Sequence, residues 1–211
     1  MTSSALRGEW TQDWVRLPHA EAGNRIGLFG GSFNPPHSGH LLVAETALKR
    51  LELDQVWWLV TPGNPLKDHA ELAPLEDRIH MTKALACHPK MKVSAHELVL
   101  GSPYTARTVE MLRVKRPALR FVWIMGADNL SGFHQWQDWK SIVRSVPVVV
   151  VNRPGASLSV IGSPMAKAFE WARLDEADAM LLPNMKPPAW TFLHARLDET
   201  SSTGLRENRI T

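Results

Sequence analysis

Cysteine is almost absent from this sequence, which has one, Cys87, among 211 residues. A single thiol cannot form an internal disulfide, and such sparing use of cysteine is typical of a reducing compartment. Blocks of one charge are also lacking, because 24 Lys and Arg residues against 21 Asp and Glu residues give a formal net charge of +3. We therefore expect no surface for nucleic acid or for an anionic membrane.

Long apolar runs are missing as well. The first 25 residues include Arg7, Glu9, Asp13 and Arg16, so they lack the uninterrupted apolar core of a secretory signal. No apolar run approaches the roughly 18 residues that a membrane-spanning helix needs. From these absences we expect a soluble, cytoplasmic protein with no membrane partner, while its oligomeric state stays open.

The sequence does contain short apolar runs rich in β-branched and aromatic residues. These runs cover 26–29, 56–60, 91–95, 121–125 and 146–151. They show little polar alternation, which is typical of strands covered on both faces of a parallel sheet. Segments with helical periodicity lie between them, at 39–51, 75–86 and 105–114. This alternation predicts an α/β protein with a doubly wound, mainly parallel sheet.

We expect one domain over residues 25–211, preceded by an extension over residues 1–24. A chain of this length suits a single domain with a sizeable core. The extension is polar and carries Trp10 and Trp14, and it either docks on the domain or stays mobile. Residues 183–190 are predicted to form a proline-rich connection.

The most informative segment is GLFGGSFNPPHSGH, residues 27–40. Gly30, Gly31 and Ser32 follow its apolar start, at the edge of the sheet where open α/β proteins bind ligands. Glycines at this place allow positive φ angles and let backbone N–H groups approach a ligand closely.

A helix should begin after Pro35-Pro36, with His37 and His40 on one face of its first turn. A helix N-terminus attracts phosphate, and two imidazoles beside it add directional hydrogen bonds, so the segment predicts a polyphosphate site. Zinc ligation is the alternative, although no Cys or carboxylate of the segment completes a ligand set. A glycine turn with capping histidines is another. The segment matches neither a Walker A loop nor a GxGxxG fingerprint.

Two further clusters are candidates for contacts with a nucleotide. Ser201-Ser202-Thr203 followed by Arg206 predicts hydroxyls at a helix start and a guanidinium one turn on, which suit phosphate oxygens. An ordinary helix cap with a surface arginine is the alternative. Asp128 follows an apolar run and Gly126, where a carboxylate can accept hydrogen bonds from a ribose hydroxyl. Asp128 could equally be a helix N-cap.

Some single residues elsewhere could either contact a ligand or have an ordinary surface or packing role. Lys67, in the glycine- and proline-containing loop PGNPLKDH, can meet a mononucleotide phosphate or remain a solvated lysine. Trp136 and Trp139 lie three residues apart, and core packing is the usual role of such a pair. Arg78 and Arg107 are predicted to be surface or structural residues.

Four stretches taken together resemble one family. GGSFNPPHSGH (30–40) is similar to the HxGH signature of a nucleotidyltransferase superfamily, and SSTGLR (201–206) to its second conserved element. SPYTART (102–108) and GADNLSGFHQWQDW (126–139) resemble elements of its bacterial nicotinate-nucleotide adenylyltransferase family. The resemblance spans residues 26 to 206 and implies a Rossmann-like nucleotidyltransferase fold. It also implies a reaction of ATP with nicotinate mononucleotide that gives deamido-NAD and pyrophosphate.

The resemblance assigns roles residue by residue. For ATP it implies Gly30, Gly31, Ser32, Phe33, His37, His40, Gly126, Asp128, Ser201, Ser202, Thr203 and Arg206. The catalytic residues among them would be His37, His40 and Arg206. For nicotinate mononucleotide it implies Tyr104, Thr105 and Trp136, with the Trp136 ring stacked on the pyridine, and Lys67 is our candidate for its phosphate. The family usually carries an aromatic residue where this chain has Gln137.

The implied chemistry is attack by a nicotinate mononucleotide phosphate oxygen on the α-phosphorus of ATP. A phosphate dianion needs no general base, so catalysis rests on alignment and charge stabilisation. Mg²⁺ is expected to bind through the ATP phosphates, with no metal site made by the protein itself. The alternatives are an adenylyltransferase that prefers nicotinamide mononucleotide and a non-catalytic, nucleotide-binding regulator.

Overall fold

Seven parallel strands form one sheet in the computed structural model, which describes residues 12–63, 72–152 and 162–195. The strands are β1 (Arg25–Gly31), β2 (Gln55–Val60), β3 (Met91–Ser94), β4 (Arg120–Gly126), β5 (Val148–Asn152), β6 (Arg173–Leu174) and β7 (Trp190–His194). Their order across the sheet is β3-β2-β1-β4-β5-β7-β6, and each neighbouring pair is parallel. The predicted doubly wound parallel sheet is confirmed.

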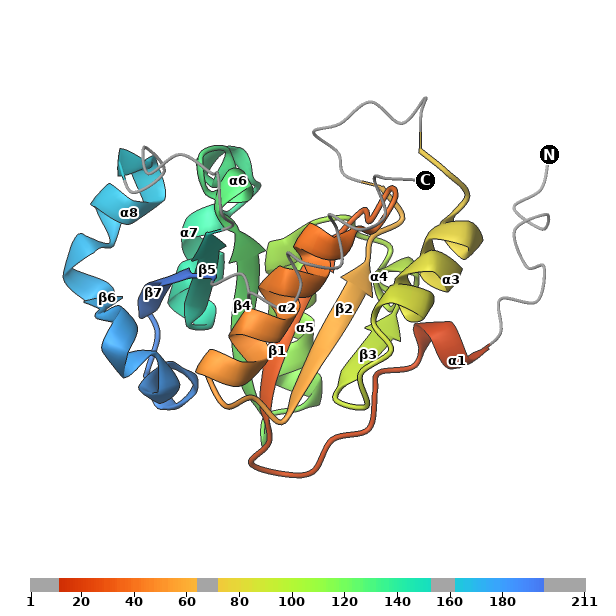
Figure 1. The fold of residues 1–211 in the computed structure, drawn as a ribbon, viewed down its shortest axis with the longest axis horizontal. Coiled ribbons are helices and arrows are strands. Elements are labelled where there is room, and N and C mark those ends of the chain that lie inside the picture. Colours follow the sequence, from red (N-terminus) through yellow and green to blue (C-terminus); the bar gives the residue numbers. More distant parts are fainter. Residues whose placement is uncertain (1–11, 64–71, 153–161, 196–211) are drawn as a thin grey trace, which may run out of the picture.

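Helices connect the strands (Figure 1). The α-helices are α1 (Gln12–Val15), α2 (Ser38–Arg50), α3 (Leu75–Leu85), α4 (Glu97–Leu100), α5 (Thr105–Lys115), α6 (Ala127–Leu130), α7 (Trp139–Ser145) and α8 (Pro164–Ala168). Short 3₁₀ helices are η1 (Phe133–Gln135), η3 (Glu170–Ala172) and η4 (Glu176–Asn184). The three predicted helices correspond to α2, α3 and α5. Within the described ranges, no helix is long and apolar enough to cross a membrane.

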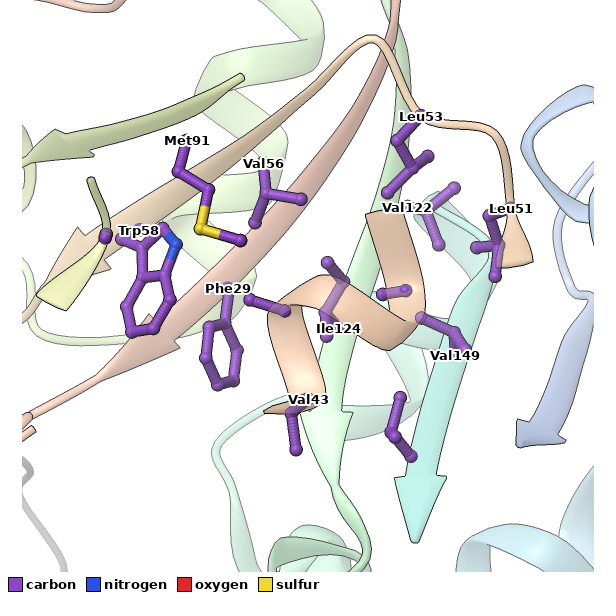
Figure 2. Close-up of a cluster of buried hydrophobic side chains, with 14 of the residues drawn as sticks. Phe29, Val43, Leu51, Leu53, Val56, Trp58, Met91, Val122, Ile124 and Val149 are labelled. Carbon is purple, nitrogen blue, oxygen red and sulfur yellow. The ribbon is translucent and has the colours of Figure 1, made fainter. Parts of the chain in front are cut away.

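Apolar side chains fill both faces of the sheet. Along β2, Val56 and Trp58 point to one face, and Trp57 and Leu59 to the other, and all four are buried. The first face, where Val56, Trp58 and Val122 are among the side chains drawn in Figure 2, is covered by α2, α3 and η4. The second face is covered by α5, α7 and α8. Because neither face meets water, the central strands are apolar throughout instead of alternating.

The chain reverses its direction of winding between β1 and β4. From β1 it proceeds through β2 to β3 toward one edge, whereas β4, β5 and β7 extend toward the other. β1 and β4 are therefore neighbours whose connecting helices lie on opposite faces of the sheet. A crevice opens beyond the carboxyl ends of two such strands, and ligands bind there in open α/β sheets.

The described part of the predicted extension is docked on the sheet. Trp14 is buried, and its carbonyl oxygen accepts hydrogen bonds from the Ala95 N–H (2.7 Å) and the Ser94 hydroxyl (3.2 Å). These contacts join residues 12–24 to the end of β3. Residues 1–11 lie outside the described residues, and the domain boundary at residue 24 stays a prediction.

The short strands β6 and β7 are absent from the predicted set. β6 has only two residues. β7 begins at Trp190, the last residue of the segment 183–190 that was predicted to be a connection. Its register beside β5, from Val148 opposite Trp190 to Asn152 opposite His194, is a long-range pairing that local sequence does not reveal.

Candidate active site

A cleft of about 690 Å³ opens at the carboxyl end of the sheet, beside the ends of β1 and β4. Eleven predicted site residues line it: Gly30, Gly31, Ser32, Phe33, His37, His40, Tyr104, Thr105, Gly126, Asp128 and Trp136. Lys67, Ser201, Ser202, Thr203 and Arg206 lie outside the described residues. We call residues 30–40 the histidine wall, and Tyr104, Thr105 and Trp136 the aromatic wall.

Glycine is required at the end of β1 for space. Both Gly30 and Gly31 are paired within the strand, opposite Leu59 and Val60 of β2. A Cβ on Gly30 would lie 2.6 Å from the Trp123 indole, and one on Gly31 would lie 3.0 Å from the Phe33 ring. Neither glycine uses the positive φ angles that glycine allows, since Gly23 and Gly101 are the described glycines that adopt them.

Phe33, predicted to bind ATP, is mainly a packing residue. Its φ angle is +46°, a left-handed conformation that L-residues seldom adopt. This turn places the ring against Phe29, Trp58 and His40, with ring centroids 5.1 to 5.4 Å apart, and leaves Phe33 only 2% exposed. The cluster of Phe29, Phe33 and Trp58 therefore packs against the His40 ring and supports it.

His37 and His40 are side by side at the start of α2. His37 is the N-cap residue and His40 is the third helical residue, so the predicted shared face is present. Their ring centroids are 3.8 Å apart, and the His37 backbone N–H donates to Nδ1 of His40 at 3.2 Å. Because Nδ1 accepts that hydrogen bond, a neutral His40 carries its hydrogen on Nε2 and donates from there.

The helix behind these histidines strengthens the anion site. α2 has 13 residues, no acidic residue in its first turn, and Lys49 and Arg50 in its last turn. Its N-terminal partial positive charge is therefore not neutralised by a side chain of that turn. No group of three or more His, Cys, Asp or Glu side chains suited to a metal ion occurs among the described residues. The arrangement suits a polyphosphate better than a zinc ion.

Asp128 lies where β4 ends. Gly126 is the N-cap of α6, so Asp128 belongs to the first helical turn and is not itself the cap. A Cβ on Gly126 would lie 2.5 Å from Oδ1 of Asp128. Glycine at 126 thus allows the exposed carboxylate to lie close to the end of the strand, on the margin of the cleft.

The aromatic wall is more open. Tyr104 is the N-cap of α5 and is 37% exposed, and Thr105 opens the helix as predicted. The Trp136 ring packs edge-on against Phe133 and Trp123, with centroids 5.2 and 6.3 Å away, and stays half-buried. A flat ring fixed in this way and lining a cleft is suited to stacking on a heteroaromatic ligand.

Arg78 holds the cleft loops together. It is 1% exposed and donates to four backbone carbonyls: Ser32 (2.7 Å), Thr61 (2.8 Å), Ala73 (2.9 Å) and Pro62 (3.1 Å). These carbonyls belong to the loops that follow β1 and β2. Burial lowers the pKa of Arg78 from its usual value. The structural role allowed by the sequence is confirmed, but its partners could not be predicted.

Glu97, which no motif singled out, also lines the cleft. It is 5% exposed, and its Oε1 accepts a hydrogen bond from the Thr108 hydroxyl at 2.9 Å. Its Oε2 is buried without a hydrogen-bond partner. Burial raises the pKa of Glu97 from its usual value, although hydrogen bonding with Thr108 and Thr61 opposes this. The only signal in the sequence is an acidic residue within the otherwise apolar run ELVL.

Comparisons with known proteins agree with this geometry. A family model described as cytidylyltransferase-like matches residues 28–208. A protein of Rhizobium meliloti, named "probable nicotinate-nucleotide adenylyltransferase", is 59% identical over 181 residues, which are 86% of this chain and 96% of that protein. A Mesorhizobium japonicum protein of the same name is 54% identical over 191 residues, covering 90% of this chain and 98% of its own length.

One solved structure is similar in fold. It is Plasmodium falciparum nicotinic acid mononucleotide adenylyltransferase complexed with NaAD, with a TM-score of 0.57 at 15% sequence identity. The likeness covers 86% of this chain and 82% of that chain. At this level of identity it supports the Rossmann-like arrangement of the sheet and helices.

Proposed function

The chain belongs to the cytidylyltransferase-like family and, within it, to the nicotinate-nucleotide adenylyltransferases, and we propose that it transfers AMP from ATP to nicotinate mononucleotide. The products are deamido-NAD and pyrophosphate, so the enzyme serves NAD biosynthesis. The observation that carries this proposal is a single cleft lined by both the paired histidines at a helix N-terminus and a half-buried tryptophan.

ATP binds with its phosphates at the histidine wall. The N-terminus of α2 and the two imidazoles supply hydrogen-bond donors, and the neutral His40 donates from Nε2. Asp128 is the proposed acceptor of a hydrogen bond from the ribose. Ser201, Ser202, Thr203 and Arg206 remain the predicted second set of phosphate contacts. They lie outside the described residues, and their roles rest on the sequence resemblance.

The transfer itself is one in-line displacement. An oxygen of the mononucleotide phosphate forms a bond to the α-phosphorus, and the bond from that phosphorus to the bridging oxygen of the β-phosphate breaks. The electron pair leaves with pyrophosphate. Because the attacking oxygen is already anionic, the protein contributes alignment and donors for the charge on the phosphates, not a base.

The divalent cation that accompanies ATP, proposed to be Mg²⁺, binds through phosphate oxygens and water. Mg²⁺ commonly keeps several waters when nucleotide phosphates bind it. When bound, it would neutralise part of the triphosphate charge, and the protein residues named above would hold the phosphates in place.

The acceptor is held by the aromatic wall. Trp136 offers a ring for stacking on the pyridine, and the N–H groups at the start of α5 suit a carboxylate oxygen. A carboxamide NH₂ turned toward the same groups would leave donors facing donors, so the wall favours nicotinate over nicotinamide. Lys67 remains the predicted contact of the mononucleotide phosphate.

Product identification tests this function directly. The protein is incubated with ATP, Mg²⁺ and either nicotinate or nicotinamide mononucleotide, and the dinucleotide is identified by mass spectrometry. Deamido-NAD formed in preference to NAD supports the proposal. Preferential formation of NAD supports the nicotinamide alternative, and binding of ATP without any product supports a non-catalytic regulator. The cytoplasmic location stays a prediction.

A further inference from the structure

We propose that Glu97 is a specificity-determining, positioning residue that keeps the aromatic wall free of negative charge by acting as a neutral carboxylic acid. The inference rests on the proposed function, because it concerns the anionic acceptor, nicotinate mononucleotide. None of the matched motifs includes Glu97, and the in-line displacement described above makes no use of it.

The position of Glu97 connects it to the acceptor side of the cleft. Its carboxyl accepts a hydrogen bond from the hydroxyl of Thr108. Thr108 lies one turn after Thr105, the first residue of α5. Residues three apart share one side of a helix. The carboxyl therefore braces the helical turn whose N–H groups are proposed to meet the nicotinate carboxylate.

The surroundings of the second carboxyl oxygen favour a proton on it. No described Lys, Arg or His forms a salt bridge with Glu97, and Oε2 is buried without a donor. The neighbouring Thr61 hydroxyl donates to the Gly63 carbonyl at 3.1 Å. Hydrogen bonding with Thr108 and Thr61 lowers the pKa of Glu97, but burial outweighs it and raises the pKa above its usual value. An ionised Oε2 would be a buried, uncompensated charge, whereas a protonated Oε2 can donate.

The charge on Glu97 matters for the choice of acceptor. An anion at this buried position would repel the nicotinate carboxylate, because Coulomb interactions through the protein interior are stronger than in water. A neutral acid removes that repulsion, so the N–H groups at the start of α5 dominate the electrostatic potential at the nicotinate carboxylate. Nicotinamide carries no such charge, so its binding should depend much less on the state of Glu97.

Other ionisable groups lie close enough to need a control. His96 precedes Glu97, and burial lowers its pKa despite a hydrogen bond to the Val15 carbonyl. His37, His40, Asp128 and Tyr104 share the cleft lining. Because all of these groups, and the substrate phosphate, are unchanged when Glu97 is replaced, the comparison of two variants isolates its contribution.

The test measures binding of nicotinate mononucleotide to the full chain by calorimetry from about pH 5 to about pH 9, a range that lies above the usual glutamate pKa of about 4.3 and covers a raised one. In the parent, Kd should rise with pH as Glu97 ionises. In Glu97→Gln, which keeps shape and neutrality, the ratio of Kd at the alkaline end to Kd at the acidic end should be smaller by about tenfold. Glu110→Gln, which removes an exposed carboxylate of α5, should keep the parental ratio.

Equal ratios in the parent and Glu97→Gln would overturn the inference. So would an equal pH effect on nicotinamide mononucleotide, because that would indicate a structural role without charge selection. If Glu97→Gln does not fold, proton uptake by the parent is measured in two buffers of different ionisation enthalpy. At alkaline pH, the protein should take up more protons when it binds nicotinate mononucleotide than when it binds nicotinamide mononucleotide. Equal uptake with the two ligands rejects the inference. If no variant binds nicotinate mononucleotide at any pH, the proposed function fails as well.

Discussion

The two walls of the cleft are built in different ways. The histidine wall is a continuous segment whose support is buried: the glycines press against rings, Phe33 packs beneath His40, and Arg78 fixes the loop carbonyls. The aromatic wall comes from separate elements, and Tyr104 and Trp136 keep part of their surface exposed. We propose that the first wall sets the rate of transfer and that the second selects the acceptor.

The largest effect on activity is expected for His40→Ala, which changes the histidine wall. Loss of one donor to charge developing in the transition state typically lowers kcat by about two to three orders of magnitude. The fold should persist, because His40 is only half-buried and the aromatic cluster below it remains. Steady-state kinetics and a thermal melt check this, with the exposed His88→Ala as the matched control. A folded His40→Ala protein with parental turnover would refute the role.

Arg78→Met tests whether the buried support is needed. Four carbonyls would lose a charged donor, so we expect about 3 kcal/mol or more of lost stability. Arg78→Lys keeps the charge but not the fork-shaped set of donors, and should recover only part of it. Urea unfolding measures both variants. A loss below about 1 kcal/mol for Arg78→Met would show that the loops do not depend on this residue.

Trp136→Ala should weaken binding of nicotinate mononucleotide and leave binding of ATP nearly unchanged. Loss of stacking on one ring costs about 1–3 kcal/mol, which raises KM for nicotinate mononucleotide by about fivefold to 150-fold. KM for ATP should change by less than about threefold. Initial rates with each substrate varied in turn provide the measurement, and Trp171→Ala, at a ring 75% exposed, is the control. Equal changes in both KM values would make Trp136 a packing residue.

The smallest effect is expected at the far end of the helix that carries the histidines. Glu176 accepts hydrogen bonds from Arg50, at the end of α2, and from His194 of β7. Burial alone would raise the pKa of Glu176, but these hydrogen bonds outweigh it and hold the pKa below its usual value. Glu176→Gln should therefore cost about 1 kcal/mol of stability at neutral pH.

The sign of the pH dependence follows from that lowered pKa. The stabilisation by Glu176 is present above its unfolded pKa and is lost as the pH falls through the folded value. The difference in thermal stability between parent and Glu176→Gln should thus shrink under acidic conditions, while KM for both substrates stays near the parental values. A difference that grows on acidification would contradict this account.

Sequence patterns predicted the elements whose signals are local. The apolar runs gave β1 to β5, and the three-residue spacing of His37 and His40 gave their shared position at the start of α2. β7 was missed because it follows directly on a proline-rich segment that was interpreted as a connection, and its place in the sheet depends on pairing with β5. The contacts of Arg78 with Ser32 and Thr61 join residues 46 and 17 positions apart, and no periodicity indicates them.

The glycines of the histidine wall show a different limit. Their presence was correctly taken as a requirement for small residues, but the reason was assigned to backbone conformation. The actual reason at Gly30 is the indole of Trp123, a neighbour contributed by β4. Crowding by a residue more than 90 positions away along the chain cannot be inferred from a local motif.

That indole has a consequence for how substrate choice can change in this protein. Trp123 is buried, touches the space above Gly30 on one side, and packs edge-on against Trp136 on the other. A methyl group at position 30 would push the Trp123 indole toward Trp136, so a change in the histidine wall would also alter the aromatic wall. Laboratory evolution toward a new acceptor should therefore randomise positions 30, 123 and 136 as a single block, since improvements found one at a time would be undone by their neighbours.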